Sequence, residues 1–315
     1  MPITLPPISR RRFLASSLGA AAAAVLGRRP ALGADAAAAP RPVDPHRFLL
    51  FSDPHLAADP KAVHRGVAVL DAFERARADA LAFGETRAAG AIVCGDLAFR
   101  NGQPGDYATF LAAARPIREA GIPVHLALGN HDDRANFFAA VPAGDRGAAA
   151  GAANAVEGRQ VTVVETPRAD WLILDSLEVT QKSPGMVGPE QRKWLAGALD
   201  ARRDKPCVVV VHHNPQPAVL PIFTGLRDTA ELLAVLLPRR QAKALVFGHT
   251  HQWEHHQMEG LHLVNLPTTG FPFAAGIATG WVDCALAAGR ARLTLRTIDP
   301  KHPQQNEVRE LAWRA

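Results

Sequence analysis

The sequence predicts an α/β fold with two mixed β-sheets. Short apolar runs that are rich in β-branched residues and stopped by a glycine or proline signal are typical of buried strands. In the first half of the chain these runs alternate with helical patterns, which favours parallel pairing through right-handed crossovers. In the second half, further runs follow one another without such helices, and they add antiparallel strands to the prediction.

The first half alternates three strands with two helices. Strands are expected at residues 48–51, 91–94 and 124–128. Between them, apolar residues recur at helical spacing over 62–89 and again over 107–120. This strand–helix–strand order predicts parallel neighbours in one sheet.

The second half begins with a surface loop, which we expect over the Gly- and Ala-rich residues 143–158. A hairpin is expected from 160–165 and 171–175. Pro189 then opens a helix that reaches residue 199, because proline is tolerated in the first turn of a helix. The remaining strands are expected at 208–211, 244–247, 261–264, 280–286 and 292–296.

The N-terminal segment is predicted to be a targeting signal. Residues 1–36 form the expected signal peptide, 37–46 an Ala- and Pro-rich linker, and 47–315 the folded domain. Residues 9–14, Ser-Arg-Arg-Arg-Phe-Leu, resemble the bacterial twin-arginine export motif. The apolar stretch 15–27 is shorter than the roughly 20 residues that span a bilayer. The alternative is an Ala-rich tail with accidental arginines.

This signal implies a periplasmic or secreted protein. The export machinery of the twin-arginine route is the expected partner, and cleavage after Ala36 or Gly33 would leave no stable membrane anchor. The formal net charge of the chain is +5, and residues 1–36 carry +4 of it. A nearly neutral mature chain gives no reason to expect a nucleic-acid partner.

Three cysteines, Cys94, Cys207 and Cys284, lie in or beside expected strands. None stands at the spacing of a metal-binding cysteine pair. An exported protein has the option of one disulfide and one free thiol. We expect instead that all three are buried and pack as small apolar side chains.

Metal-ligand residues end five of the expected strands. Residues two apart on a strand face the same side, which groups the members of an Asp-x-His or His-x-His pair. Carboxylate and imidazole ligands without thiolate suit Zn, Mn, Fe, Co or Ni and argue against a structural zinc site. Histidines satisfied in the core are the alternative, but seven clustered polar side chains without metal are costly to bury. The candidate ligands are Asp53, His55, Asp96, Asn130, His212, His249 and His251.

The order Asp-x-His, Gly-Asp, Gly-Asn-His-Asp, His and Gly-His-Thr-His resembles the calcineurin-like metallophosphoesterase superfamily over residues 48 to about 270. The resemblance implies two mixed β-sheets sandwiched between helices. It places Asp53, His55 and His251 on one metal ion, and Asp96 as a bridge between two ions. On the second ion it places Asn130, His249 and His212; His212 is preferred to His213 because the family ligand directly ends the strand.

The resemblance also implies a reaction. Two divalent or mixed-valence ions about 3.5–4 Å apart lower the pKa of bound water, and a metal-bound hydroxide attacks phosphorus. His131 corresponds to the family histidine that stabilises or protonates the leaving group. A structural role beside Asn130 is the alternative for His131. Asp132 is expected to hold the ring of His131.

Three segments resemble the branch of class III cyclic-nucleotide phosphodiesterases and glycerophosphodiesterases: residues 129–134, 172–176 and 189–195. Phe99 stands where purple acid phosphatases have a metal-binding tyrosine, so a tyrosinate site is not expected. Because export separates the protein from cytosolic cyclic AMP, we expect a periplasmic phosphodiesterase on another small phosphoester. A phosphomonoesterase of the same fold and a non-catalytic metal-dependent binding scaffold are the alternatives.

Three other segments have open interpretations. His64 and Arg65 fit either a contact to substrate phosphate or a solvated helix start. Residues 253–256 are expected to cap a surface hairpin. Residues 265–270 follow an expected strand and are candidates for the rim of the pocket, with a position away from the pocket as the alternative.

Overall fold

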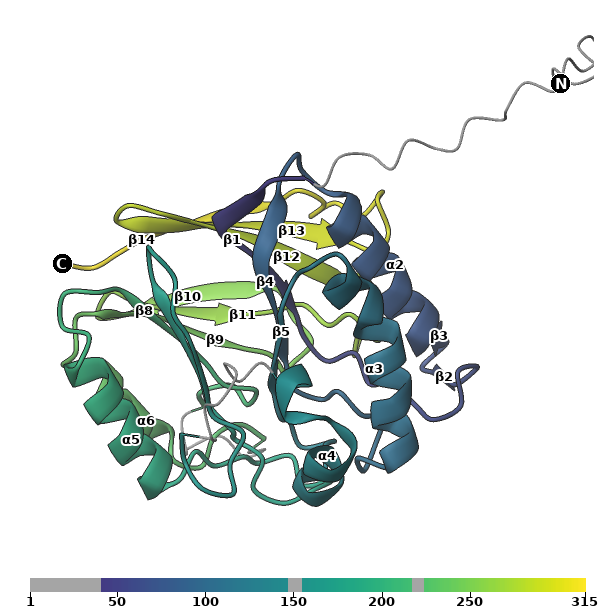
Figure 1. Cartoon of the computed structure of the whole chain (residues 1–315), viewed down its shortest axis with the longest axis horizontal. Coiled ribbons are helices and arrows are strands. Elements are labelled where there is room, and N and C mark those ends of the chain that lie inside the picture. The colour runs from purple at the N-terminus through teal and green to yellow at the C-terminus, as the bar shows by residue number, and fades with distance from the viewer. Residues whose placement is uncertain (1–40, 147–154, 217–223) are drawn as a thin grey trace, which may run out of the picture. The chain divides into compact units, whose positions relative to one another are not determined.

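The computed structural model describes residues 41–146, 155–216 and 224–315, and the account below is confined to them (Figure 1). Residues 42–315 belong to one unit of the chain. The expected signal peptide and residues 37–40 of the expected linker lie outside the described residues. Strand β1 begins at Val43, so the last residues of the expected linker belong to the sheet.

The first sheet has six strands in the order β14-β13-β12-β1-β4-β5. Strands β1, β4 and β5 run parallel to one another, and the antiparallel strands β12 to β14 extend the sheet from the other side of β1. The strands are β1 (Val43–Phe51), β4 (Arg87–Cys94), β5 (Val124–Ala127), β12 (Gly280–Ala287), β13 (Arg290–Thr297) and β14 (Val308–Ala312).

The second sheet also has six strands, in the order β10-β11-β9-β8-β7-β6. Its inner strands β7, β8, β9 and β11 are parallel, and β6 and β10 pair antiparallel at the two edges. The strands are β6 (Thr162–Val164), β7 (Asp170–Ile173), β8 (Cys207–Val210), β9 (Ala242–Phe247), β10 (Glu254–Met258) and β11 (Leu261–Asn265).

Helices cover the outer faces of both sheets (Figure 1). One apolar cluster joins α2 and α3 to the first sheet, and another joins α5 and α6 to the second. A third fills the space between the sheets. The predicted fold, two mixed sheets between helices, is therefore confirmed. The helices are α2 (Val69–Ala82), α3 (Pro104–Glu119), α4 (Arg134–Ala140), α5 (Pro189–Asp200) and α6 (Thr229–Leu236).

Strand β1 shows why the strand sequences are continuously apolar. Successive side chains of a strand point to opposite faces. Phe48 and Leu50 pack between the two sheets, whereas Leu49 and Phe51 pack against α2 and α3. A strand covered on both faces needs apolar residues at every position, and the unbroken run 48–51 reflects this double burial.

The predicted helix over 62–89 is the largest difference from the expected elements. A small hairpin, β2 (Val63–His64) and β3 (Val67–Ala68), occupies its beginning, and β4 starts at Arg87. The hairpin turn consists of Arg65 and Gly66, both with positive φ. The expected helix pattern is thus real only over α2.

Most of the other differences concern ends and short elements. The hairpin of β6 and β7, helix α5 and the three cysteines, free and buried, agree with expectation. The helices α4 and α6 and the strand β14 had not been expected. Of the expected loop, residues 147–154 lie outside the described residues. Residues 254–256 belong to strand β10 itself, and the hairpin turns at Glu259 and Gly260.

Candidate metal centre

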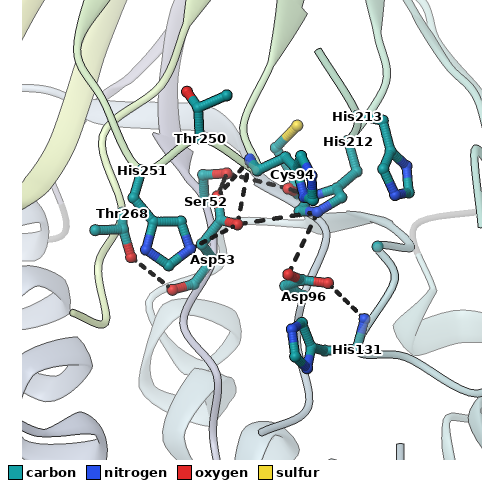
Figure 2. A network of polar contacts seen from close by, with 12 residues as sticks. Ser52, Asp53, Cys94, Asp96, His131, His212, His213, Thr250, His251 and Thr268 are labelled. Carbon is teal, nitrogen blue, oxygen red and sulfur yellow. Dashed lines mark hydrogen bonds and ion pairs between the residues drawn. The ribbon is translucent and has the colours of Figure 1, made fainter. Parts of the chain in front are cut away.

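The seven predicted ligands follow the carboxyl ends of five strands. Strands β1, β4 and β5 deliver Asp53, His55, Asp96 and Asn130 from the first sheet, and β8 and β9 deliver His212, His249 and His251 from the second. Parallel strands bring their carboxyl ends to one edge, where open α/β sheets bind ligands. Figure 2 shows the carboxylates of Asp53 and Asp96 directed toward the rings of His251 and His212.

Asp96 lies between two groups of ligand atoms. Its Oδ2 is 3.6 Å from Nε2 of His55 and 3.4 Å from Nε2 of His212. On one side, Nε2 of His251 lies 3.1 Å from Nε2 of His55 and 3.3 Å from Oδ1 of Asp53. The ligand atoms of Asp53, His55 and His251 all lie within 4.8 Å of one another. The position of Asp96 is the one that a bridging ligand needs.

Several of these atoms are buried without a hydrogen-bond partner. Among the described residues, Oδ1 of Asn130 and Nε2 of His212 are two such atoms. A buried polar atom without a partner is unfavourable. Both are atoms that bind metal ions, and both belong to the expected second ion. The residues therefore fit a bound metal ion, and the orphaned atoms are the observation that supports it.

The electrostatics of the site also call for cations. Burial alone would lower the pKa of His212, but the charges of Asp96 and Asp53 outweigh it and raise the pKa to about 10. A metal ion would replace that proton between the same carboxylates. Burial lowers the pKa of His55 to about 3 and that of His249 to about 4, so both rings are neutral, as ligands must be.

Carbonyl groups behind the site orient two of the rings. Nδ1 of His212 hydrogen-bonds to the carbonyl oxygen of Cys94 at 2.9 Å, and Nδ1 of His251 to that of Phe271 at 2.6 Å. Each contact leaves Nε2 to face the carboxylates. Metal-binding histidines are commonly fixed in this way.

The ligand side chains are aimed by an unusual backbone. Five of the seven ligands have φ between 48° and 69°, in the left-handed region that non-glycine residues seldom occupy. The sequence pattern predicted that the alternation of side chains along a strand gives these ligands a common direction. The ligands lie beyond the ends of the strands, so their positive φ values, rather than that alternation, set the direction. Strain of this kind concentrates at functional sites. The five are Asp53, His55, Asp96, His249 and His251.

The glycines that precede three ligands serve two purposes. Gly95 has a φ of 75° and permits a sharp turn before Asp96. Gly129 and Gly248 leave space instead. A Cβ atom at Gly129 would lie 2.6 Å from the backbone nitrogen of Asp96, and one at Gly248 would lie 2.5 Å from Oδ2 of Asp53. Any side chain there would displace a ligand.

His131 lies on the wall of a cavity of about 320 Å³ that the metal ligands also line. Its backbone nitrogen donates to Oδ1 of Asp96 at 2.8 Å. Its Nδ1 lies 2.9 Å from the carbonyl oxygen of Arg100, and its ring meets that of His55 edge-on at 5.0 Å. Nδ1 therefore faces the carbonyl of Arg100, and a ring nitrogen of His131 also lies within 4.8 Å of ligand atoms of His55 and Asp96.

Asp132 does not hold the ring of His131, so that expectation is wrong. Its buried carboxylate accepts hydrogen bonds from the backbone nitrogens of Gly129, Ala98 and Leu97 at 2.9, 3.2 and 3.3 Å. It thereby ties the turn after β5 to the turn after β4. Asp132 thus positions the two turns that carry Asn130 and Asp96.

His213 lies beside the site without facing the carboxylates. Its Nδ1 hydrogen-bonds to Oγ of Ser176 at 2.8 Å, and its ring lies 4.8 Å from that of His249. His212, in contrast, contacts both carboxylates, within 3.9 Å of Asp53. The contacts are those expected if His212 rather than His213 is the ligand after β8.

The three branch-specific segments meet in one buried network. Arg134 donates to both carboxylate oxygens of Asp175, at 2.8 and 3.1 Å. The backbone nitrogen of Asp175 donates to the side chain of Gln191, the first buried residue of α5. The network ties the turn that carries Asn130 to the second sheet.

Some residues at the site had no recognised signal in the sequence. Phe271 and Phe273 line the cavity, and the ring of Phe273 stacks on His251 at 4.1 Å. Thr268 and Thr269 had been considered for the pocket rim. Their hydroxyls instead donate to the carbonyl oxygens of Asp53 and Ser52, behind the first ligand turn.

A sandwich of two mixed sheets with carboxylate, amide and imidazole side chains gathered at one edge is typical of metallohydrolases of α/β type. The profile of the calcineurin-like phosphoesterases matches residues 46–253. The chain belongs to this family.

Relatives and solved structures agree with that assignment. The chain is 27% identical over 251 residues to the 3′,5′-cyclic adenosine monophosphate phosphodiesterase CpdA of Pseudomonas aeruginosa, covering 78% of this chain and 84% of the relative. A cAMP/cGMP dual specificity phosphodiesterase of Mycobacterium tuberculosis is 27% identical over 207 residues, covering 64% and 58%.

Two solved structures share the fold. A dimetal phosphatase from Danio rerio aligns with a TM-score of 0.65 at 14% identity, covering 86% of this chain and 100% of that one. GAP50, the anchor in the inner membrane complex of Plasmodium, aligns at 0.57 and 12% identity, covering 85% and 89%. At these identities the likeness concerns the fold alone.

Proposed function

We propose that this metal-dependent phosphoester hydrolase is a dinuclear phosphodiesterase that acts on small phosphodiesters outside the cytoplasm. The observation that carries the proposal is the double set of ligand atoms around Asp96, with buried orphans at Asn130 and His212. Bound ions would supply a nucleophile from water and polarise the phosphoryl oxygens.

The residues of the chain account for the departure of the leaving group. His131 stands at the cavity wall, and its Nδ1 is held by the carbonyl of Arg100. Because a carbonyl only accepts, Nδ1 donates to it, and the imidazolium form of His131 would offer its second proton, on Nε2, to a departing oxygen. The turn that carries Asn130 is held by the hydrogen bond from the backbone nitrogen of Gly129 to the carboxylate of Asp132.

The comparisons support a diester over a monoester, because the bacterial relatives named above are cyclic-nucleotide phosphodiesterases. The charge of the cavity does not distinguish the two esters: no Lys or Arg is among the described residues that line it, but bound metal ions would themselves supply positive charge.

A non-catalytic scaffold is the competing proposal from another class. The fold also occurs in GAP50, whose description is that of an anchor. Against a scaffold role, every predicted ligand is present and His131 stands in the wall of the same cavity, where a scaffold needs no proton donor. A phosphomonoesterase remains the alternative within the enzyme class.

The proposed location rests on the arginine motif at residues 9–14, which lies outside the described residues. In the part that the structure describes, no helix has the length and apolar character needed to cross a bilayer. An exported enzyme would meet phosphodiesters other than cytosolic cyclic nucleotides.

Purified protein loaded separately with Mn, Zn, Fe, Co or Ni tests the proposed function. We expect hydrolysis of bis(4-nitrophenyl) phosphate to exceed that of 4-nitrophenyl phosphate, and the Asp96→Asn variant to lose both activities. Metal content measured in parallel separates a lost ion from lost chemistry. Bound metal without hydrolysis of any phosphoester would favour the scaffold, and faster hydrolysis of the monoester would favour the phosphatase.

A further inference from the structure

A second cavity, of about 400 Å³, adjoins the metal centre. It shares His131, Phe271 and Phe273 with the first cavity, so these residues belong to the wall of both. The remaining wall is cationic and aromatic. It consists of His64, Arg65, Phe99, Arg100 and Gln181.

Its charge is positive and uncompensated. Within the described ranges, neither Arg65 nor Arg100 has a carboxylate partner, and no Asp or Glu lines the cavity. The guanidinium of Arg65 lies 5.3 Å from the ring centre of Phe273, and that of Arg100 lies 5.1 Å from that of Phe99. Such stacking leaves the N–H groups at the guanidinium edges available to an anion.

The backbone conformation at Arg65 indicates that the arginine side chain has a function, because the conformation itself favours another residue. The β2–β3 hairpin has a two-residue turn in which Arg65 and Gly66 have φ of 48° and 81°. A turn with two positive φ values is the type I′ arrangement, which favours Asn-Gly. Arginine at the first position is strained, and the hairpin holds it beside Phe273.

We propose that this second cavity binds the leaving group of the phosphodiester, and that the leaving group carries an anionic group of its own, held by Arg65 and Arg100. The inference rests on the proposed function. His131 provides the direction: it would protonate the departing oxygen, and it stands in the wall common to both cavities. The leaving group therefore departs into the cationic cavity.

The substrate class is then a phosphodiester with a second phosphate or carboxylate on the leaving side. The rings of Phe99 and Phe273, the latter 47% exposed, suit a planar group beside that anion. A nucleotide leaving group satisfies both features. A phosphorylated glycerol satisfies only the first, so the two sources of the anion are distinguishable.

Calorimetric titration of the metal-loaded protein tests the subsite without turnover. We expect thymidine 3′,5′-bisphosphate to bind about tenfold more tightly than either thymidine monophosphate, as one added charge-assisted contact predicts. The Arg65→Asn variant should lose this preference while its melting temperature stays the same or rises, because asparagine suits the turn. Arg203→Asn, which removes the same charge from an exposed turn before β8, should keep the preference.

The outcomes separate the two proposals. Equal affinity for the three nucleotides in the unmodified protein, or an unchanged preference in Arg65→Asn, would overturn the subsite even if diesters are hydrolysed. Failure to hydrolyse any diester would overturn the proposed function and the leaving-group assignment with it. The same comparison with glycerol 3-phosphate and glycerol 1,3-bisphosphate separates the sources: an equal gain means that the anion alone is recognised, and a smaller gain means that a planar base contributes.

Discussion

His131 has one fixed ring nitrogen and one that is free for chemistry. A proton donor matters most when the leaving oxygen is strongly basic, because charge develops on it in the transition state. We predict that His131→Ala slows hydrolysis of an alkyl diester by about 10²–10⁴-fold. The loss on a nitrophenyl diester should be much smaller. Rates on both substrates, measured with metal content, check the prediction.

Two results would assign His131 a different role. Equal losses on the two esters would indicate that the ring positions the phosphate, and loss of metal would indicate a structural support beside Asn130. His256→Ala is the matched control, because it removes an exposed histidine of β10 outside the site and should leave both rates unchanged.

Asp96 is the ligand whose loss should affect both ions. Its carboxylate faces His55 on one side and His212 on the other. Asp96→Asn removes the bridging charge and should lower metal content at both positions, whereas His251→Ala should mainly empty one. Elemental analysis of the two variants and the unmodified protein measures this. Undiminished metal in Asp96→Asn would exclude the bridge.

At the scale of the residue, the sequence predicted which side chains form the site better than what each one does. The seven ligands were recognisable because each follows an apolar run. The role of Asp132 was not recognisable from the sequence, because adjacent residues in a tight turn point in unrelated directions. His131 faces the cavity, whereas Asp132 faces the backbone of the neighbouring turn. The aromatic lining by Phe271 and Phe273 had no periodic signal.

At the scale of the element, periodicity located the buried strands and the longer helices. Periodicity did not predict the structure where a two-residue turn interrupts an apolar pattern. The apolar pattern of 62–89 suggested one helix, but Arg65-Gly66 forms a turn and the β2–β3 hairpin precedes α2. Helix α4 is only seven residues long, and Asp133 starts it by capping the nitrogen of Asn136. So short a helix offers too few turns for a pattern.

The network of Arg134 and Asp175 links α4 to the second sheet and should be important for stability. Asp175 is fully buried, so removing the guanidinium leaves a charged group without its partner. We predict that Arg134→Ala lowers the free energy of unfolding by about 2–3 kcal/mol, below the usual loss for a broken buried pair because backbone nitrogens still donate to Asp175. Arg115→Ala, in an exposed pair with Glu119, should change it by less than about 1 kcal/mol. Urea unfolding of both variants compares the pairs; similar small losses would show that the network is not stabilising.

At the scale of the whole molecule, export remains a prediction from the sequence. If the recognised pair is Arg10 and Arg11, replacing both with Lys should leave uncleaved precursor in the cytoplasm. Fractionation and the size of the mature protein measure the effect, and Arg28→Lys with Arg29→Lys serves as a charge-matched control. Continued maturation of the first variant would indicate another route, or recognition of Arg11 and Arg12.

The two sheets meet at the ligand set, and this should make metal binding stabilise the entire domain. Each expected ion takes ligands from both: Asp53 and His55 of the first sheet share an ion with His251 of the second, and Asn130 shares the other with His212. An ion that binds only the folded chain stabilises it by about 2.7 kcal/mol at a concentration 100-fold above its dissociation constant. For a domain of this size that corresponds to a rise in melting temperature of roughly 5–10 °C. We therefore expect chelation to lower the melting temperature by this amount and added metal to restore it, with little response in Asp96→Asn. If chelation removes the metal and the melting temperature does not change, the ions do not stabilise the packing of the two sheets.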